Sequence, residues 1–171
     1  MQEMKRPDDT PISAAVLVAL IERPAGPAII FTRRTMTVAT HKGQISFPGG
    51  TAEPGDTSPI DTAQREAREE IGLDPAHVQF IEYLPQVFTH TGFVVTPVLA
   101  RIETAPEYAL QHDEVEQVFE VPLAYLRAAG TLEIRETLFG DTAFTDYRST
   151  TDEGVIWGMT GRILYELLER L

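Results

Sequence analysis

Three glutamates at helical spacing in the middle of the chain are the residues best suited to chemistry. Glu69 and Glu70 follow Glu66 by three and four residues, so on a helix the three carboxylates share one face. Like charges at this spacing repel by a few tenths of a kcal/mol per pair. An acidic ridge of this kind suits Mg²⁺, which binds one or two carboxylates together with water and phosphate oxygens. A solvated acidic face is the alternative interpretation of these three residues alone.

The residues before the glutamates supply what a phosphate site needs. Gly49 and Gly50 have no side chain to block a phosphate, and their backbone carbonyls could reach a metal, although an ordinary turn is the alternative. Arg65 adjoins the glutamates and is expected to pair with Asp56 or Glu53, which would brace the preceding loop against the helix. Together these residues favour a site for a metal and a phosphate over a solvated acidic face.

One helix must carry the glutamates, and its ends are marked in the sequence. Ser58 is a suitable N-cap, Pro59 suits the first helical position, and Asp61 completes a shortened capping box. Gly72 suits the C-terminal end because it tolerates positive φ. The apolar positions recur at spacings of three and four and predict one buried stripe, formed by Ile60, Ala63, Ala67 and Ile71.

Strand-like segments flank this helix on both sides. Strands are expected at residues 12–21, 28–33, 78–88, 93–102 and 115–121, with a hairpin of residues 132–139 and 142–148 around Gly140-Asp141. Helices are expected at residues 122–129 and 163–171. The pattern predicts a single α/β domain over residues 1–171, in which helices sandwich a mixed β-sheet.

The overall composition excludes several classes of function. With 26 acidic and 14 basic residues the net charge is −12, which argues against binding to nucleic acid. The absence of cysteine excludes disulfides and thiolate metal sites. The best apolar run, residues 12–21, falls well short of the roughly 18 residues of a membrane span. The first nine residues are polar and mixed in charge, unlike a secretory signal, so a cytoplasmic location is expected. The sequence carries no signal of an oligomeric state.

The string from Arg65 to Leu73 resembles the second half of the Nudix box, R-E-U-x-E-E-x-G-U, in which U is aliphatic. Every specified position is filled. The first half of the box differs, because Asp56 replaces its glutamate and the loop from Asp56 to Arg65 is one residue longer. This variation is similar to the coenzyme A pyrophosphatase branch of the Nudix family, and the resemblance implies the α/β/α sandwich of that family.

An upstream signature of the same branch is also matched. The matching pieces are Thr32-x-Arg34, His41-x-Gly43 and Phe47-Pro48-Gly49-Gly50. Ala39 differs, because the branch usually has arginine there, and Lys42 or Arg33 is expected to compensate for it. The predicted substrate-binding residues are Arg34, His41, Lys42, Gly49 and Gly50.

The resemblance also implies roles for the acidic residues. Glu66 and Glu70 would bind Mg²⁺ directly, with Mn²⁺ as an alternative, and Glu69 would be a further ligand or a contact through water. Nudix enzymes often take their general base from a loop remote from the box, which here means Glu114 or Glu116. We prefer Glu114 because it is expected to lie in the loop before the strand. The predicted catalytic residues are therefore Glu69, Glu114 and Arg65.

The predicted reaction is hydrolysis of the diphosphate of coenzyme A or its derivatives. The products would be 3′,5′-ADP and 4′-phosphopantetheine or its acyl form. One alternative is another nucleoside diphosphate derivative, such as ADP-ribose, a dinucleotide or an oxidised nucleotide, which Ala39 leaves open. Another is a Nudix-fold module that holds a nucleotide without cutting it. The complete set of Glu66, Glu69 and Glu70 argues against such a module.

Overall fold

A large mixed sheet forms the centre of the molecule in the computed structural model, which describes residues 10–104 and 106–171. Its two longest strands, β1 (Ile12–Ile21) and β7 (Phe93–Ile102), run parallel along their whole length. Strands β2 (Ala28–Arg34) and β4 (Gly49–Thr51) pair with β1 in the antiparallel sense. The sheet is therefore mixed, as predicted.

The other elements complete this sheet and add a smaller one. The large sheet also contains β3 (Ile45–Ser46), β5 (Val78–Tyr83), β6 (Val87–Phe88) and β8 (Val115–Pro122). The second sheet consists of β9 (Leu132–Phe139), β10 (Thr142–Thr151) and β11 (Gly154–Ile156). The helices are α1 (Pro59–Ile71), α2 (Leu123–Leu126) and α3 (Gly158–Leu168), with a 3₁₀ turn, η1, at Pro75–His77.

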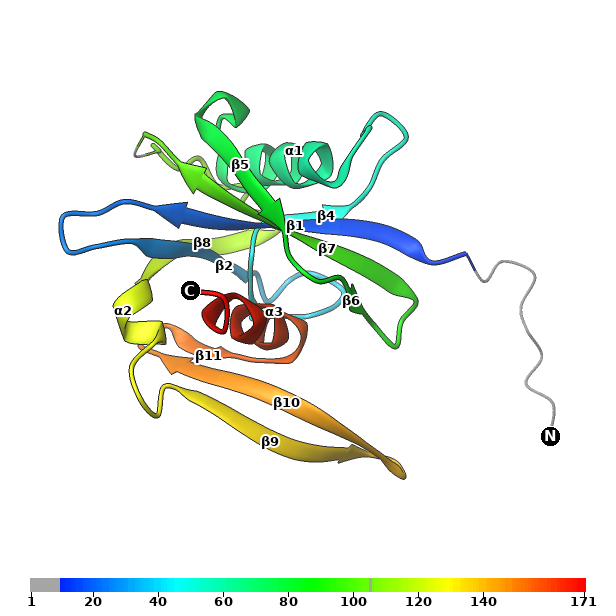
Figure 1. The fold of residues 1–171 in the computed structure, drawn as a ribbon. Coiled ribbons are helices and arrows are strands. Elements are labelled where there is room, and N and C mark those ends of the chain that lie inside the picture. The colour runs from blue at the N-terminus through cyan, green and yellow to red at the C-terminus, as the bar shows by residue number, and fades with distance from the viewer. Residues whose placement is uncertain (1–9, 105) are drawn as a thin grey trace.

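Helices α1 and α3 cover opposite faces of the large sheet, and the second sheet lies beyond α3 (Figure 1). Successive residues of a strand point to opposite faces, so β1 contributes to two hydrophobic clusters. Ala15 packs in the cluster that contains Ala67 of α1, whereas Val16 packs in the cluster that contains Leu164 of α3. The predicted fold class, an α/β sandwich with a mixed sheet, is confirmed.

The predicted helix that carries the glutamates is present as α1. It begins at Pro59 and ends at Gly72, whose φ of 72° allows its N–H to bond back to Ala67 and Arg68. The small side chains of Ala63 and Ala67 are fully buried and let the helix lie close to the sheet, whereas Ile60 is only partly buried.

The predicted capping box of α1 is wrong in detail. The Ser58 side chain makes no capping hydrogen bond. Instead, the Asp61 carboxylate accepts hydrogen bonds from the backbone N–H and the hydroxyl of Thr57. The Asp61 side chain therefore binds Thr57, the residue before the N-cap, by hydrogen bonds.

Several predicted boundaries also differ from the structure. The predicted strand over residues 78–88 is divided into β5 and β6, because Pro85 has no N–H with which to continue the ladder. Helix α3 begins at Gly158, five residues earlier than predicted. The sequence does not indicate its first turn, because Gly158 and Gly161 have low helix propensity. The hairpin turn at Gly140-Asp141 is confirmed.

Within residues 10–104 and 106–171, no helix is both long and apolar enough to span a bilayer. The expectation that the chain lacks an export signal concerns residues 1–9, which lie outside the described residues.

Candidate active site

Gly49 and Gly50 of β4 lie at a narrow seam between α1 and the sheet. A Cβ atom on Gly50 would lie 2.5 Å from a carboxylate oxygen of Glu66. A Cβ atom on Gly49 would overlap the carbonyl oxygen of Ala15 and lie 2.6 Å from the Cα of Val16. A side chain at Gly50 would therefore displace a glutamate of α1, whereas a side chain at Gly49 would overlap the backbone of β1.

Glu70 is enclosed at the same seam. Glu70 is only 6% exposed, and its carboxylate accepts a hydrogen bond of 3.1 Å from the N–H of Gly49. Burial raises the pKa of Glu70 to about 8, against the opposing effects of the Gly49 hydrogen bond and the Arg34 charge. The charges of Glu66 and Glu114 raise this pKa further. The charges of Glu66, Glu114 and Arg34 therefore all act on the Glu70 carboxylate.

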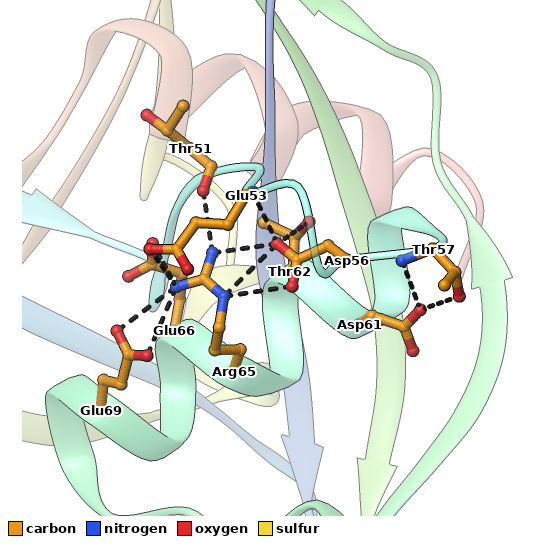
Figure 2. A network of polar contacts seen from close by, with 9 residues as sticks. All are labelled: Thr51, Glu53, Asp56, Thr57, Asp61, Thr62, Arg65, Glu66 and Glu69. Carbon is orange, nitrogen blue, oxygen red and sulfur yellow. Dashed lines mark hydrogen bonds and ion pairs between the residues drawn. The ribbon is translucent and has the colours of Figure 1, made fainter.

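Arg65 ties the loop before α1 to the helix (Figure 2). Its guanidinium donates hydrogen bonds to the carbonyl of Thr51 at 2.9 Å and to Asp56 at 3.0 Å. It also reaches Glu66 at 3.2 Å and Glu69 at 3.3 Å. The predicted pairing of Arg65 with Asp56 is confirmed, and an ion pair with Glu53 is present as well at 3.6 Å.

Asp56 closes the same loop from the other side. Its carboxylate accepts hydrogen bonds from Arg65, from the N–H of Glu53 at 2.9 Å and from the hydroxyl of Thr62 at 2.9 Å (Figure 2). The bond from Arg65 and these further donors hold the pKa of Asp56 well below its usual range. Asp56, which departs from the glutamate of the Nudix box, therefore braces the loop. Thr62 was not singled out from the sequence, since only the loop conformation reveals its partner.

The three predicted metal ligands do not converge in this structure. Glu66 and Glu69 both turn toward Arg65, whereas Glu70 turns toward Gly49. Across the described part of the chain, no three His, Asp or Glu side chains are arranged as a metal-binding group. The assignment of the three glutamates as metal ligands stays a prediction.

A β-bulge decides which acidic residue of the distant loop faces α1. Arg33 pairs with Gln117 and Arg34 pairs with Val115, so Glu116 is the extra residue of the bulge. The bulge directs the side chain of Val115 toward α1, where it packs in the hydrophobic cluster that contains Ala67. Glu114 precedes it in the loop, and its charge raises the pKa values of both Glu66 and Glu70. The structure therefore brings Glu114 to the acidic helix and leaves Glu116 exposed on the strand.

The two adjacent arginines of β2 point to opposite faces of the sheet. Arg33 donates to the carbonyl of Glu153 and pairs with its carboxylate at 3.5 Å, at the turn between β10 and β11. It is thus engaged with the second sheet. Arg34 lies on the α1 side near Glu70, and its Nε is buried without a hydrogen-bond partner among the described residues. Arg34 is therefore the available donor for an anionic ligand.

His41 and Lys42 lie in the exposed loop before β3. His41 has a φ of 57°, and its Nδ1 lies 2.9 Å from Oε1 of Gln44. Within the described residues, neither side chain takes part in the hydrogen bonds or ion pairs of the α1 glutamates. The structure does not bring these two predicted substrate-binding residues to the acidic helix, and their role stays a prediction.

This geometry can be set beside known proteins. Residues 11–139 match the NUDIX domain. The chain is 38% identical to the uncharacterized Nudix hydrolase NudL of Escherichia coli O7:K1 strain IAI39 over 154 residues. These residues cover 90% of this chain and 80% of that protein. The chain therefore belongs to the Nudix family. It is a Nudix pyrophosphohydrolase whose substrate is a nucleoside diphosphate derivative, and the family generally uses divalent metal ions.

Solved structures agree on the fold. A MutT/nudix family protein from Enterococcus faecalis is similar with a TM-score of 0.63 and 16% identity, over 98% of this chain and 63% of that one. An Ap4A hydrolase from C. elegans is similar with a TM-score of 0.56 and 19% identity, over 65% of this chain and 80% of that one. At these identities the likeness concerns the fold alone.

Alanine substitutions should separate the two glycines of the seam. In Gly50→Ala the new methyl group meets the end of a flexible glutamate, so Glu66 should move at little cost in stability and turnover should fall by about tenfold or more. In Gly49→Ala the methyl group meets the β1 backbone, so the unfolding free energy should fall by about 1–3 kcal/mol. Urea unfolding and steady-state assays measure both effects. Equal stability losses in the two variants would contradict this account.

The Asp56–Arg65 pair should make stability depend on pH. The pKa of Asp56 is lowered in the folded state, so its contribution is present above the ordinary aspartate pKa of about 4 and is lost as the pH falls further. The wild type should be more stable than Asp56→Asn at pH 7, and the difference should shrink below about pH 4. Urea unfolding at pH 7, 5, 4 and 3 measures it, with Asp141→Asn in the distant hairpin as control. A difference that is constant over this range would contradict the assignment.

Proposed function

We propose that this Nudix enzyme hydrolyses the diphosphate of coenzyme A or its derivatives. The observation that carries the proposal is Arg34, whose Nε is buried without a hydrogen-bond partner among the described residues and whose charge lowers the pKa of Glu70. Arg34 belongs to the Thr32-x-Arg34 piece that resembles the coenzyme A pyrophosphatase signature. A buried guanidinium donor without a partner suits a phosphate oxygen, because charge-assisted hydrogen bonds to phosphate are strong.

The residues of the seam suit a divalent cation. Glu66 and Glu70 offer hard carboxylate oxygens, and the absence of a Cβ on Gly50 lets the Glu66 carboxylate lie against β4. The raised pKa of Glu70 indicates a carboxylate whose charge is only partly compensated by the protein itself. We assign Glu66 and Glu70 as direct ligands, with Glu69 as a further ligand or a contact through water. When bound, Mg²⁺ or Mn²⁺ would neutralise charge on the diphosphate and activate water.

The other residues have distinct roles in this proposal. Glu114 accepts the proton of the attacking water as general base. Arg34 binds a phosphate oxygen, and Gly49 and Gly50 contribute backbone groups to substrate binding. Arg65 acts through Glu66 and Glu69, which it holds in place, so we assign it as a positioning residue.

Two exposed residues are assigned to the outer part of the substrate. His41 and Lys42 stand in the solvent-facing loop that leads into β3, on the chain segment between Arg34 and Gly49. From this loop they would bind phosphate groups remote from the bond that is cut. The products of the reaction would be 3′,5′-ADP and 4′-phosphopantetheine or its acyl form.

A second substrate class is favoured by one residue. Ala39 occupies the place where the coenzyme A branch usually has arginine, and Arg33 is engaged with Glu153 and so does not replace it. Loss of one phosphate-binding group would favour a diphosphate without the 3′-phosphate of coenzyme A, such as ADP-ribose or a dinucleotide.

A panel of diphosphates with product identification tests the proposal. In the presence of Mg²⁺, coenzyme A should be cleaved to 3′,5′-ADP and 4′-phosphopantetheine faster than ADP-ribose or a dinucleotide. Glu70→Gln should lower turnover by about two orders of magnitude or more, because it removes a proposed metal ligand. Glu116→Gln is the matched control and should remain active. Much faster turnover of ADP-ribose would overturn the substrate assignment, and full activity of Glu70→Gln would overturn the metal assignment.

A further inference from the structure

We propose that Thr35 is the positioning residue for the general base Glu114, an inference that rests on the proposed function. Thr35 directly follows β2 and is 9% exposed. Its backbone N–H donates to the carbonyl of Glu114 at 3.0 Å, which extends the pairing of β2 with β8 by one bond beyond Arg34 and Val115. Its hydroxyl donates to the carbonyl of Asp113 at 3.2 Å.

The opposite side of the same loop is fixed to α1. The N–H of Ala109 donates to the carbonyl of Ile71 at 2.9 Å, and the N–H of Gln111 donates to the carbonyl of Glu70 at 2.9 Å. A turn then closes with the bond from Val115 N–H to the Gln111 carbonyl at 2.8 Å. The loop that carries Glu114 is therefore held between the end of α1 and the end of β2.

Among these contacts that hold the Glu114 loop, the hydrogen bond from the Thr35 hydroxyl is the one that a side-chain substitution can remove. The contacts to α1 are made by backbone groups, which side-chain substitutions leave in place. Glu114 itself is exposed, so the position of its carboxylate depends on how firmly its backbone is held. The Thr35 hydroxyl fixes the carbonyl of Asp113, one residue before Glu114, and thereby restricts the backbone from which the Glu114 side chain extends.

Loss of this restriction should affect the chemical step more than substrate binding. A displacement of about 1 Å in a catalytic group can lower a rate by up to about 100-fold. Thr35→Val keeps the shape of the side chain and removes the hydroxyl. We expect it to lower kcat by about tenfold and to change KM by less than about twofold. Thr35→Ser keeps the hydroxyl and should recover most of the wild-type kcat.

A double-mutant cycle tests the inference with the full chain, Mg²⁺ and the diphosphate that the wild type hydrolyses fastest. The variants are Thr35→Val, Thr35→Ser, Glu114→Gln and the double variant Thr35→Val with Glu114→Gln. If Thr35 acts through Glu114, the substitution Thr35→Val should change kcat by less than about twofold in the Glu114→Gln background. Unfolding midpoints of all variants are measured in parallel, and Thr35→Ala replaces Thr35→Val if the latter does not unfold cooperatively.

Three outcomes would overturn the inference. The first is a wild-type kcat in Thr35→Val. The second is a fall in kcat by the same factor in both backgrounds, which would make the role of Thr35 merely structural. The third is a Glu114→Gln variant as active as the wild type, which would remove the base on which Thr35 is proposed to act. Failure of the proposed function is recognised separately, because the wild type would then hydrolyse another diphosphate of the panel much faster than coenzyme A, while the cycle measured with that diphosphate still tests Thr35.

Discussion

The Glu70 carboxylate is enclosed between α1 and the sheet, and the remaining features of the site depend on keeping it there. Burial of an ionised carboxylate costs several kcal/mol unless nearby groups compensate it. Here the Gly49 N–H and the Arg34 charge compensate in part, while Glu66 and Glu114 work against them. Gly49 donates its N–H to Glu70, and a side chain on Gly49 would overlap the β1 backbone that lies behind it.

The geometry of the sheet delivers the surrounding charges to this seam. Strand alternation places Arg34 on the α1 face and Arg33 on the face of the second sheet. The bulge at Glu116 shifts the alternation of β8 by one residue, so that Val115 enters the α1-side core and Glu114 arrives beside the glutamates. Arg65 contributes from the helix itself, because it holds both the acidic side chains and the preceding loop. The proposed site for a polyanion thus lies on a chain with a net charge of −12.

The sequence predicts those features that are determined by residues close together in the chain. The start of α1 at Pro59, its end at Gly72 and the pairing of Arg65 with Asp56 follow from residues that lie near one another in the chain. The preference for Glu114 over Glu116 rests on its expected place in the loop, whereas the bulge that separates the two could not be predicted, because it arises from pairing with a strand about eighty residues earlier. The turn of Glu66 and Glu69 toward Arg65 likewise depends on competing side-chain contacts that spacing does not express.

The central claim is that the seam beside Glu70 binds the divalent cation used in diphosphate hydrolysis. Titration of the protein with Mn²⁺, followed by the electron paramagnetic resonance signal of the free ion, measures this binding directly. The account predicts that Glu70→Gln weakens Mn²⁺ binding by about tenfold or more, whereas Glu116→Gln on the neighbouring bulge leaves it unchanged. Equal Mn²⁺ affinity in the wild type and in a folded Glu70→Gln variant would contradict it.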